Sequence, residues 1–359
     1  MIDGGEREAE RLERIRMTRD SAAAVAPRDG DLRRVRAQRH AAPGFDRAMW
    51  RQMAELGWIG LRLPEEAGGA GMGMAESVAL YEELGAGLVP EPLVAASLAA
   101  AALAATPDPS LLADVLAGDV LVPLAWQGGR DAIGLSDGPA GVLHHVPMAG
   151  AADHLLLPVR EGGRTRLLLL DPAEAEATPA WRQDGTVVAT LRVSAGVGRV
   201  LAEDVGEALD RALDEATLGT AAYLLGVAER AFAITLDYLR QRRQFGQPLA
   251  AFQALQHRAA DMKIQLTLTR ASVEGAADEL DAGATPVRRA AAVSRAKARA
   301  ADTALLVGRE AIQMHGAIGY ADACDIGLFT RKAMALANEH GSAMAHRARF
   351  ARLADELAA

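Results

Sequence analysis

The sequence contains little cysteine, and its start lacks an apolar run, which narrows the classes of protein that it can encode. A single cysteine, Cys324, excludes an internal disulfide and a cysteine-based zinc site, so a reducing compartment is favoured. Residues 1–20 carry charges where a secretory signal needs an apolar run of about 7 to 15 residues. We therefore expect a cytoplasmic protein without a metal site.

The sequence also lacks a stretch long enough to span a membrane and a cluster of basic residues that would bind nucleic acid. The most apolar stretch, residues 94–107, is shorter than the roughly 20 residues that a span requires, and prolines stand near both ends. Basic residues are scattered among acidic ones, and the formal net charge is -8. Small-molecule chemistry is therefore favoured over binding to membranes or nucleic acid.

Familiar catalytic signatures are missing too. The sequence has no G-x-G-x-x-G after a strand, no Walker loop, no H-E-x-x-H and no G-x-S-x-G. The glycine-rich run Gly68–Gly73 stands between two predicted helices, where a flexible connection is expected and a phosphate loop is not.

The chain divides into three blocks by pattern. Residues 1–118 are predicted to be helical, with Val78, Tyr81 and Leu84 on one face. Residues 119–200 carry short β-type runs separated by turn signals, beginning with VLVPLAW at 120–126. The remainder, 201–359, has the long helical pattern of a bundle.

Two details support the bundle. An apolar stripe with alternating three- and four-residue spacing is typical of helices in an up-down bundle. Thr285-Pro286 resembles an N-cap followed by proline in the first turn of a helix that continues to about His315. The stripe consists of Phe252, Leu255, Ala259, Met262 and Leu266.

A break rich in glycine and proline, Arg242–Pro248, separates two of the predicted helices. Free backbone N–H groups at the next helix start, together with Arg242 or Arg243, would suit an anion, although such turns are also common as plain helix punctuation. A second glycine-bearing turn, Gln313–Gly319, ends another helix and by itself indicates a glycine C-cap.

Together these turns resemble conserved segments of the acyl-CoA dehydrogenase family of flavoproteins. Arg242–Gly246, with Phe252-Gln253 and Ala260–Met262 after it, is similar to the family's R-x-Q-F-G, F-Q and A-D-M signature. Ala54–Gly85 resembles its N-terminal block, and Glu310–Tyr320 its Q-x-H-G-G-x-G-Y turn. The segments occur in the family's order and cover nearly the whole chain.

The resemblance implies a mainly α fold: an N-terminal helical domain, a middle antiparallel β barrel or sandwich and a C-terminal four-helix bundle. It also implies FAD bound at a subunit interface, where the family's arginine and phenylalanine serve the flavin of a neighbouring subunit. The residues that match cofactor-binding positions are Arg242, Gln244, Phe245, Gln253, Gln313 and Gly316.

The implied activity is α,β-desaturation of an acyl-CoA or acyl-carrier thioester in lipid metabolism, with an electron-transfer flavoprotein or a similar acceptor. A glutamate of a Tyr-Glu-Gly-Thr segment usually takes the α proton. Here the segment is Glu339–Ser342, with Glu339 one place early and His340 at the usual position. We expect Glu339 to be the base, although the offset rotates a helical side chain by about 100°.

Two other residues compete with Glu339. His340 has a suitable ordinary pKa, or it satisfies a hydrogen bond at an interface. Glu215 lies about one place from a base position that some members use in the first bundle helix, or it is a solvated acid near the helix start.

The β block departs from the family pattern. After Ala125–Gln127 the sequence has only Gly-Gly-Arg-Asp in place of a T-E-P-x-A-G-S-D-like stretch, and the block is short. This reduction resembles the smaller subunits of heteromeric actinobacterial enzymes. Two hypotheses follow: a homo-oligomeric desaturase, or a non-catalytic partner that completes the FAD site of a heterotetramer with a related subunit.

Overall fold

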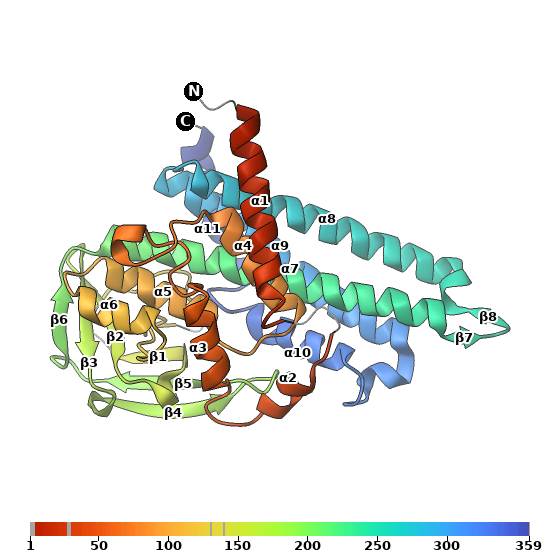
Figure 1. Cartoon of the computed structure of the whole chain (residues 1–359), viewed down its shortest axis with the longest axis horizontal. Helices are drawn as coiled ribbons and strands as arrows, with labels where there is room; N and C mark the ends of the chain where they lie inside the picture. Colours follow the sequence, from red (N-terminus) through yellow and green to blue (C-terminus); the bar gives the residue numbers. More distant parts are fainter. Residues whose placement is uncertain (1–3, 27–29, 130, 139–140, 359) are drawn as a thin grey trace. The chain divides into compact units, whose positions relative to one another are not determined.

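The computed structural model describes residues 4–26, 30–129, 131–138 and 141–358, and the chain falls into two compact units (Figure 1). One unit comprises residues 1–33, 78–89 and 218–359, and the other comprises residues 34–77 and 90–217. No helix in the described ranges combines the length and the apolar character that a membrane crossing requires.

The first unit is a helical bundle. Thr285 caps α9 as predicted, because its side chain accepts a hydrogen bond from the Arg288 N–H and Pro286 opens the helix. Met262 and Leu266 of the predicted stripe are buried. Its helices are α1 (Gly4–Ala22), the later part of α4 (Met74–Ala86), most of α7 (Gly206–Gln241), α8 (Gln253–Asp281), α9 (Pro286–His315), α10 (Ile326–Leu336) and α11 (Ala343–Ala358).

Glycines allow α4 and α7 to cross closely within this unit. A Cβ atom at Gly226 would lie 1.9 Å from the Glu82 carbonyl oxygen, and one at Gly85 would lie 2.1 Å from the Tyr223 carbonyl oxygen. Any larger residue at either position would force the helices apart.

The second unit combines short helices with two antiparallel sheets, ordered β1-β5-β4 and β2-β3-β6. Apolar residues from both sheets, including Leu143, Leu157, Leu170 and Leu191, form one buried cluster, as in a sandwich. Its elements are α2 (Arg33–Gln38), α3 (Arg47–Glu55), α5 (Leu93–Ala104), α6 (Pro109–Leu116), β1 (Val142–Pro147), β2 (Leu155–Glu161), β3 (Arg164–Leu170), β4 (Ala175–Trp181), β5 (Val187–Val193) and β6 (Arg199–Ala202).

The mainly helical fold with a middle antiparallel β region is confirmed. The sheets remain separate and do not close into a barrel. A strand at 120–126 was a wrong prediction, because that segment contributes only an isolated bridge from Leu124 to Leu156. Pro123 has no N–H to donate, which limits ladder formation there.

Candidate functional site

The break between α7 and α8 is a β-hairpin. Its strands are β7 (Arg243–Gln244) and β8 (Gln247–Pro248), and Gln244 pairs with Gln247. The Leu249 N–H donates to the Arg242 carbonyl oxygen at 2.8 Å and closes the base of the hairpin. Figure 1 shows the hairpin at the tip where α7 ends and α8 begins.

The hairpin turn holds Phe245 in an unusual conformation. Phe245 has φ of 51° and Gly246 has φ of 80°, the pattern of a type I′ turn. Glycine accepts this geometry easily, but a bulky residue rarely does. The Phe245 side chain is 88% exposed and meets the Phe252 ring edge-on, with 6.0 Å between ring centroids. A strained backbone that displays an aromatic ring is typical of a binding residue.

Donors suited to an anion surround this ring. Arg242, Arg243, Gln244 and Gln253 are exposed, and Gln253 is the first residue of α8. The N-cap of α8, Phe252, gives no side-chain hydrogen bond to the first-turn N–H groups. Guanidinium groups beside a helix N-terminus suit a phosphate.

The second glycine turn follows α9. Gln313 is exposed, and Gly316 adopts φ of 69° and ψ of -145°, a region that is almost exclusive to glycine. The Tyr238 ring stacks on His315, with centroids 4.3 Å apart, and its hydroxyl donates to the His315 carbonyl oxygen at 3.3 Å. The Arg242 N–H donates to the Tyr238 carbonyl oxygen, so this pair joins the turn after α9 to the base of the hairpin.

Sequence reasoning missed the Tyr238–His315 pair, although Tyr238 stands one helical turn before Arg242. His315 Nδ1 lies 2.7 Å from the Ala311 carbonyl oxygen and donates to it. Burial lowers the pKa of His315 and outweighs the opposing effect of this hydrogen bond. The ring is therefore neutral near pH 7, with Nε2 as an acceptor.

The three candidate bases lie in different surroundings. Glu339 is half-buried in the turn after α10, and its N–H donates to the Leu336 carbonyl oxygen at 3.1 Å. His340 is buried, and its Nδ1 lies 3.0 Å from the Thr220 hydroxyl. An internal hydrogen bond therefore engages His340, which the resemblance predicts at the usual base position.

Glu215 is held by arginines. Its carboxylate accepts hydrogen bonds from Arg62 at 2.8 and 3.1 Å and from Arg211 at 3.1 Å. The helix α7 begins at Gly206, so Glu215 lies in its third turn and is not an acid at the helix start. The Glu215 carboxylate is therefore engaged by two guanidinium groups.

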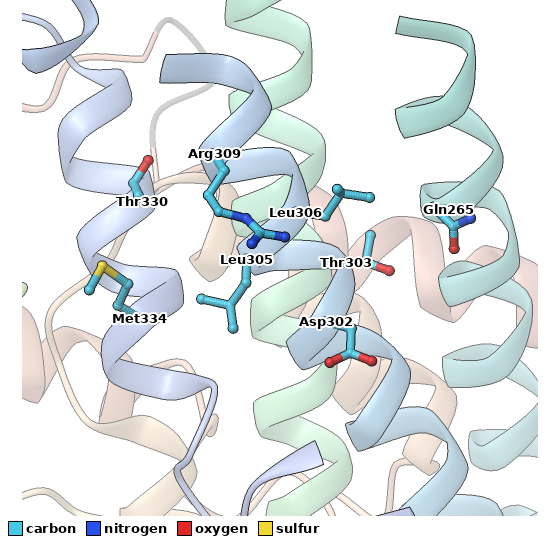
Figure 2. A pocket seen from close by; sticks show the side chains of 8 residues that line it. All are labelled: Gln265, Asp302, Thr303, Leu305, Leu306, Arg309, Thr330 and Met334. Carbon is cyan, nitrogen blue, oxygen red and sulfur yellow. The ribbon is translucent and has the colours of Figure 1, made fainter. Parts of the chain in front are cut away.

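An open groove of about 720 Å³ lies on the bundle surface over α8, α9 and α10 (Figure 2). It combines apolar side chains with polar ones, and Asp302 is paired with Arg347. None of the residues predicted from sequence lines it. The lining residues are Gln265, Asp302, Thr303, Leu305, Leu306, Arg309, Thr330 and Met334.

Comparison with known proteins matches both ends of the chain to one family. Residues 13–112 match the acyl-CoA dehydrogenase N-terminal domain, and residues 205–354 match its C-terminal domain. The chain is 31% identical over 335 residues to acyl-CoA dehydrogenase IpdE2 of Mycobacterium tuberculosis, covering 92% of each protein. It is 31% identical over 303 residues to acyl-CoA dehydrogenase FadE27 of the same species, covering 77% of this chain and 79% of the relative.

Solved structures agree with this match. The Tcur3481-Tcur3483 steroid ACAD aligns with a TM-score of 0.84 and 30% identity, over 98% of this chain and 99% of that chain. The ChsE4-ChsE5 complex of Mycobacterium tuberculosis aligns with a TM-score of 0.80 and 25% identity, over 97% of each chain. The chain therefore belongs to the acyl-CoA dehydrogenase family, whose members are FAD-dependent oxidoreductases.

Proposed function

We propose that this chain catalyses α,β-desaturation of an acyl thioester, with the Arg242–Phe245 hairpin completing the FAD site of a neighbouring subunit. The observation that carries the proposal is the strained and 88% exposed Phe245. Its donor set fits FAD, because Arg242 and the first turn of α8 suit the pyrophosphate and Phe245 offers a face to a flat ring. Gln313 and Gly316 would approach the same cofactor.

The reaction removes a proton from the α carbon and a hydride from the β carbon. When bound, FAD accepts the hydride. The carboxylate of Glu339 accepts the α proton, because it is the only carboxylate between Arg331 and Arg347, the segment that stands in place of Tyr-Glu-Gly-Thr. Neutral thioesters are weakly acidic at this carbon, so the base must be positioned and partly desolvated, which suits the half-buried Glu339.

The substrate class is an acyl-CoA or acyl-carrier thioester, and the product is its α,β-unsaturated counterpart. Electrons leave to an electron-transfer flavoprotein or a similar acceptor. This assignment rests on membership of the family.

The burial of His340 favours a second candidate function, that of a non-catalytic partner subunit. The residue at the usual base position is buried and bonded inside the chain, and two solved relatives are complexes of two differently named chains. In this alternative the chain is the non-catalytic partner in a heterotetramer, and a related subunit supplies the base.

A flavin absorbance spectrum of the purified chain, followed by anaerobic titration with several acyl-CoAs, separates the two functions. A yellow chain that acyl-CoA bleaches supports the desaturase. A colourless chain that becomes yellow and reducible only when co-expressed with a related subunit supports the partner role. A chain that stays colourless in both preparations contradicts both.

We expect the chain to be oligomeric in solution. The exposed Phe245, together with Ile264 and Leu268 on the outer side of α8, leaves apolar surface that a second subunit would cover. Light scattering of the purified protein measures the mass. A persistent monomer that retains one FAD per chain would contradict a shared site.

Replacing Arg242 with alanine is expected to weaken FAD retention more than folding. A charge-assisted contact to phosphate contributes about 1.5 to 3 kcal/mol, so FAD affinity should fall roughly tenfold or more. Arg240→Ala is the matched control, because Arg240 is an exposed arginine at the end of α7 that pairs with Asp237 at 2.8 Å. Flavin content after gel filtration provides the measurement, and equal retention by both variants would remove Arg242 from the site.

A further inference from the structure

A buried lysine contacts the segment that carries Glu339. Lys297, on α9, is one of only three lysines in the sequence and is 0% exposed. Its Nζ donates to the carbonyl oxygens of Ala337 at 2.8 Å and Gly341 at 3.1 Å. These two carbonyls bracket residues 338–340, and residues 337–341 are called the 337–341 turn below.

A buried histidine contacts the same turn from α11. His346 is 0% exposed, and its Nε2 lies 2.8 Å from the His340 carbonyl oxygen. Because a carbonyl only accepts, Nε2 carries the hydrogen, and Nδ1 accepts from the Ser294 hydroxyl at 3.3 Å. Burial and the nearby charge of Lys297 lower the pKa of His346 to about 3, so the ring stays neutral.

The turn needs such support, because its backbone is unfavourable. His340 has φ of 55° and Gly341 has φ of 99°, and a non-glycine residue keeps a left-handed conformation only where its surroundings fix it. Thr220 holds the His340 side chain, while Lys297 and His346 hold three carbonyls of the turn. Glu339 lies within these contacts and stays half-buried.

We propose that Lys297 and His346 are positioning residues, which fix the 337–341 turn so that the Glu339 carboxylate keeps one location relative to the substrate α carbon. This inference rests on the proposed function, in which Glu339 is the base. A compact ammonium suits the task, because it can donate to several carbonyls after a helix C-terminus and complements the dipole of α10. A misplacement of about 1 Å can slow catalysis roughly 100-fold, so the contacts would affect rate more than binding.

Paired variants of His346 test the proposal. His346→Phe keeps a ring but removes the donor, and His346→Gln keeps an N–H donor without the ring. At saturating acyl-CoA, the flavin of His346→Phe should be reduced about 10- to 100-fold more slowly than the flavin of wild type. The affinity for acyl-CoA and the FAD content should be unchanged. His346→Gln should recover most of the rate. Lys297→Met, which keeps the length of the side chain, should show the same loss as His346→Phe.

Thr269→Val is the matched control. Thr269 is buried in the same bundle, and its hydroxyl lies 2.8 Å from that of Thr303, so the variant loses a buried hydrogen bond that does not involve the turn. Its flavin should be reduced at the wild-type rate. An equal slowing in Thr269→Val would show that any loss of bundle stability slows the reaction, and would overturn the proposal.

Two further results would overturn the proposal while leaving the proposed function intact. One is a wild-type reduction rate in His346→Phe and Lys297→Met, and the other is an equal loss in His346→Gln and His346→Phe. Failure of the proposed function is distinct. In that case wild type is not reduced by any acyl-CoA, or Glu339→Gln is still reduced, and the turn then has no base to position.

Discussion

Glu339→Gln is expected to abolish flavin reduction by acyl-CoA while FAD stays bound. The amide keeps the size of the side chain but cannot accept the α proton, and a positioned general base contributes about 10²- to 10⁴-fold to a rate. The 337–341 turn is held through backbone carbonyls of other residues, so the change should leave its conformation intact. Anaerobic stopped-flow bleaching of the flavin measures the loss, and the spectrum before mixing reports bound FAD.

Glu215→Gln is the control for this experiment. Glu215 already binds Arg62 and Arg211, so the variant should lose ion pairs and some stability but keep flavin reduction close to wild type. If Glu215→Gln is the inactive variant, the base lies on α7. If both variants match a wild type that is itself inactive, the chain is the non-catalytic partner.

Acid is expected to destabilise the protein through His346. Burial, and then the charge of Lys297, lowers the pKa of this ring in the folded state to about 3, from an ordinary value of 6.5. Between these values the unfolded chain binds a proton that the folded chain does not. The contribution of neutral His346 to the free energy of unfolding is therefore fully present above about pH 6.5, and it is lost as the pH falls toward 3. From pH 6.5 to 4 the loss amounts to about 3 kcal/mol.

Denaturant unfolding of wild type and His346→Gln, measured at one chain concentration across this pH range, isolates the effect. Glutamine does not titrate, so the stability of the variant should fall less steeply, and the difference between the two proteins should change by about 3 kcal/mol. Parallel pH dependences would show that His346 is not buried as a neutral ring.

Local signals explain which parts of the fold the sequence could predict. Thr285-Pro286 predicts the start of α9 because capping depends on neighbouring residues. Glycine and proline likewise predict a break between α7 and α8, although they did not indicate that it forms a β-hairpin. The family resemblance then joins this hairpin to the turn after α9.

Contacts between distant residues could not be predicted in this way. Arg62 pairs with Glu215 across 153 positions, and Thr220 contacts His340 across 120. The resemblance predicts His340 at the base position but does not predict its burial, which depends on how α7 and the 337–341 turn pack together. The Lys297 contacts were missed for the same reason, because lysine on a helix is normally a surface residue.

The burial of Lys297 also protects it from acylation. Lysine amines are targets of acylation, which removes their charge, whereas guanidinium groups stay protonated. Most of the 39 basic residues are arginine; of the three lysines, Lys297 and Lys332 are buried and only Lys263 is exposed. A member of a family that handles activated thioesters therefore offers them a single accessible lysine amine, and the ammonium bound to the 337–341 turn keeps its charge.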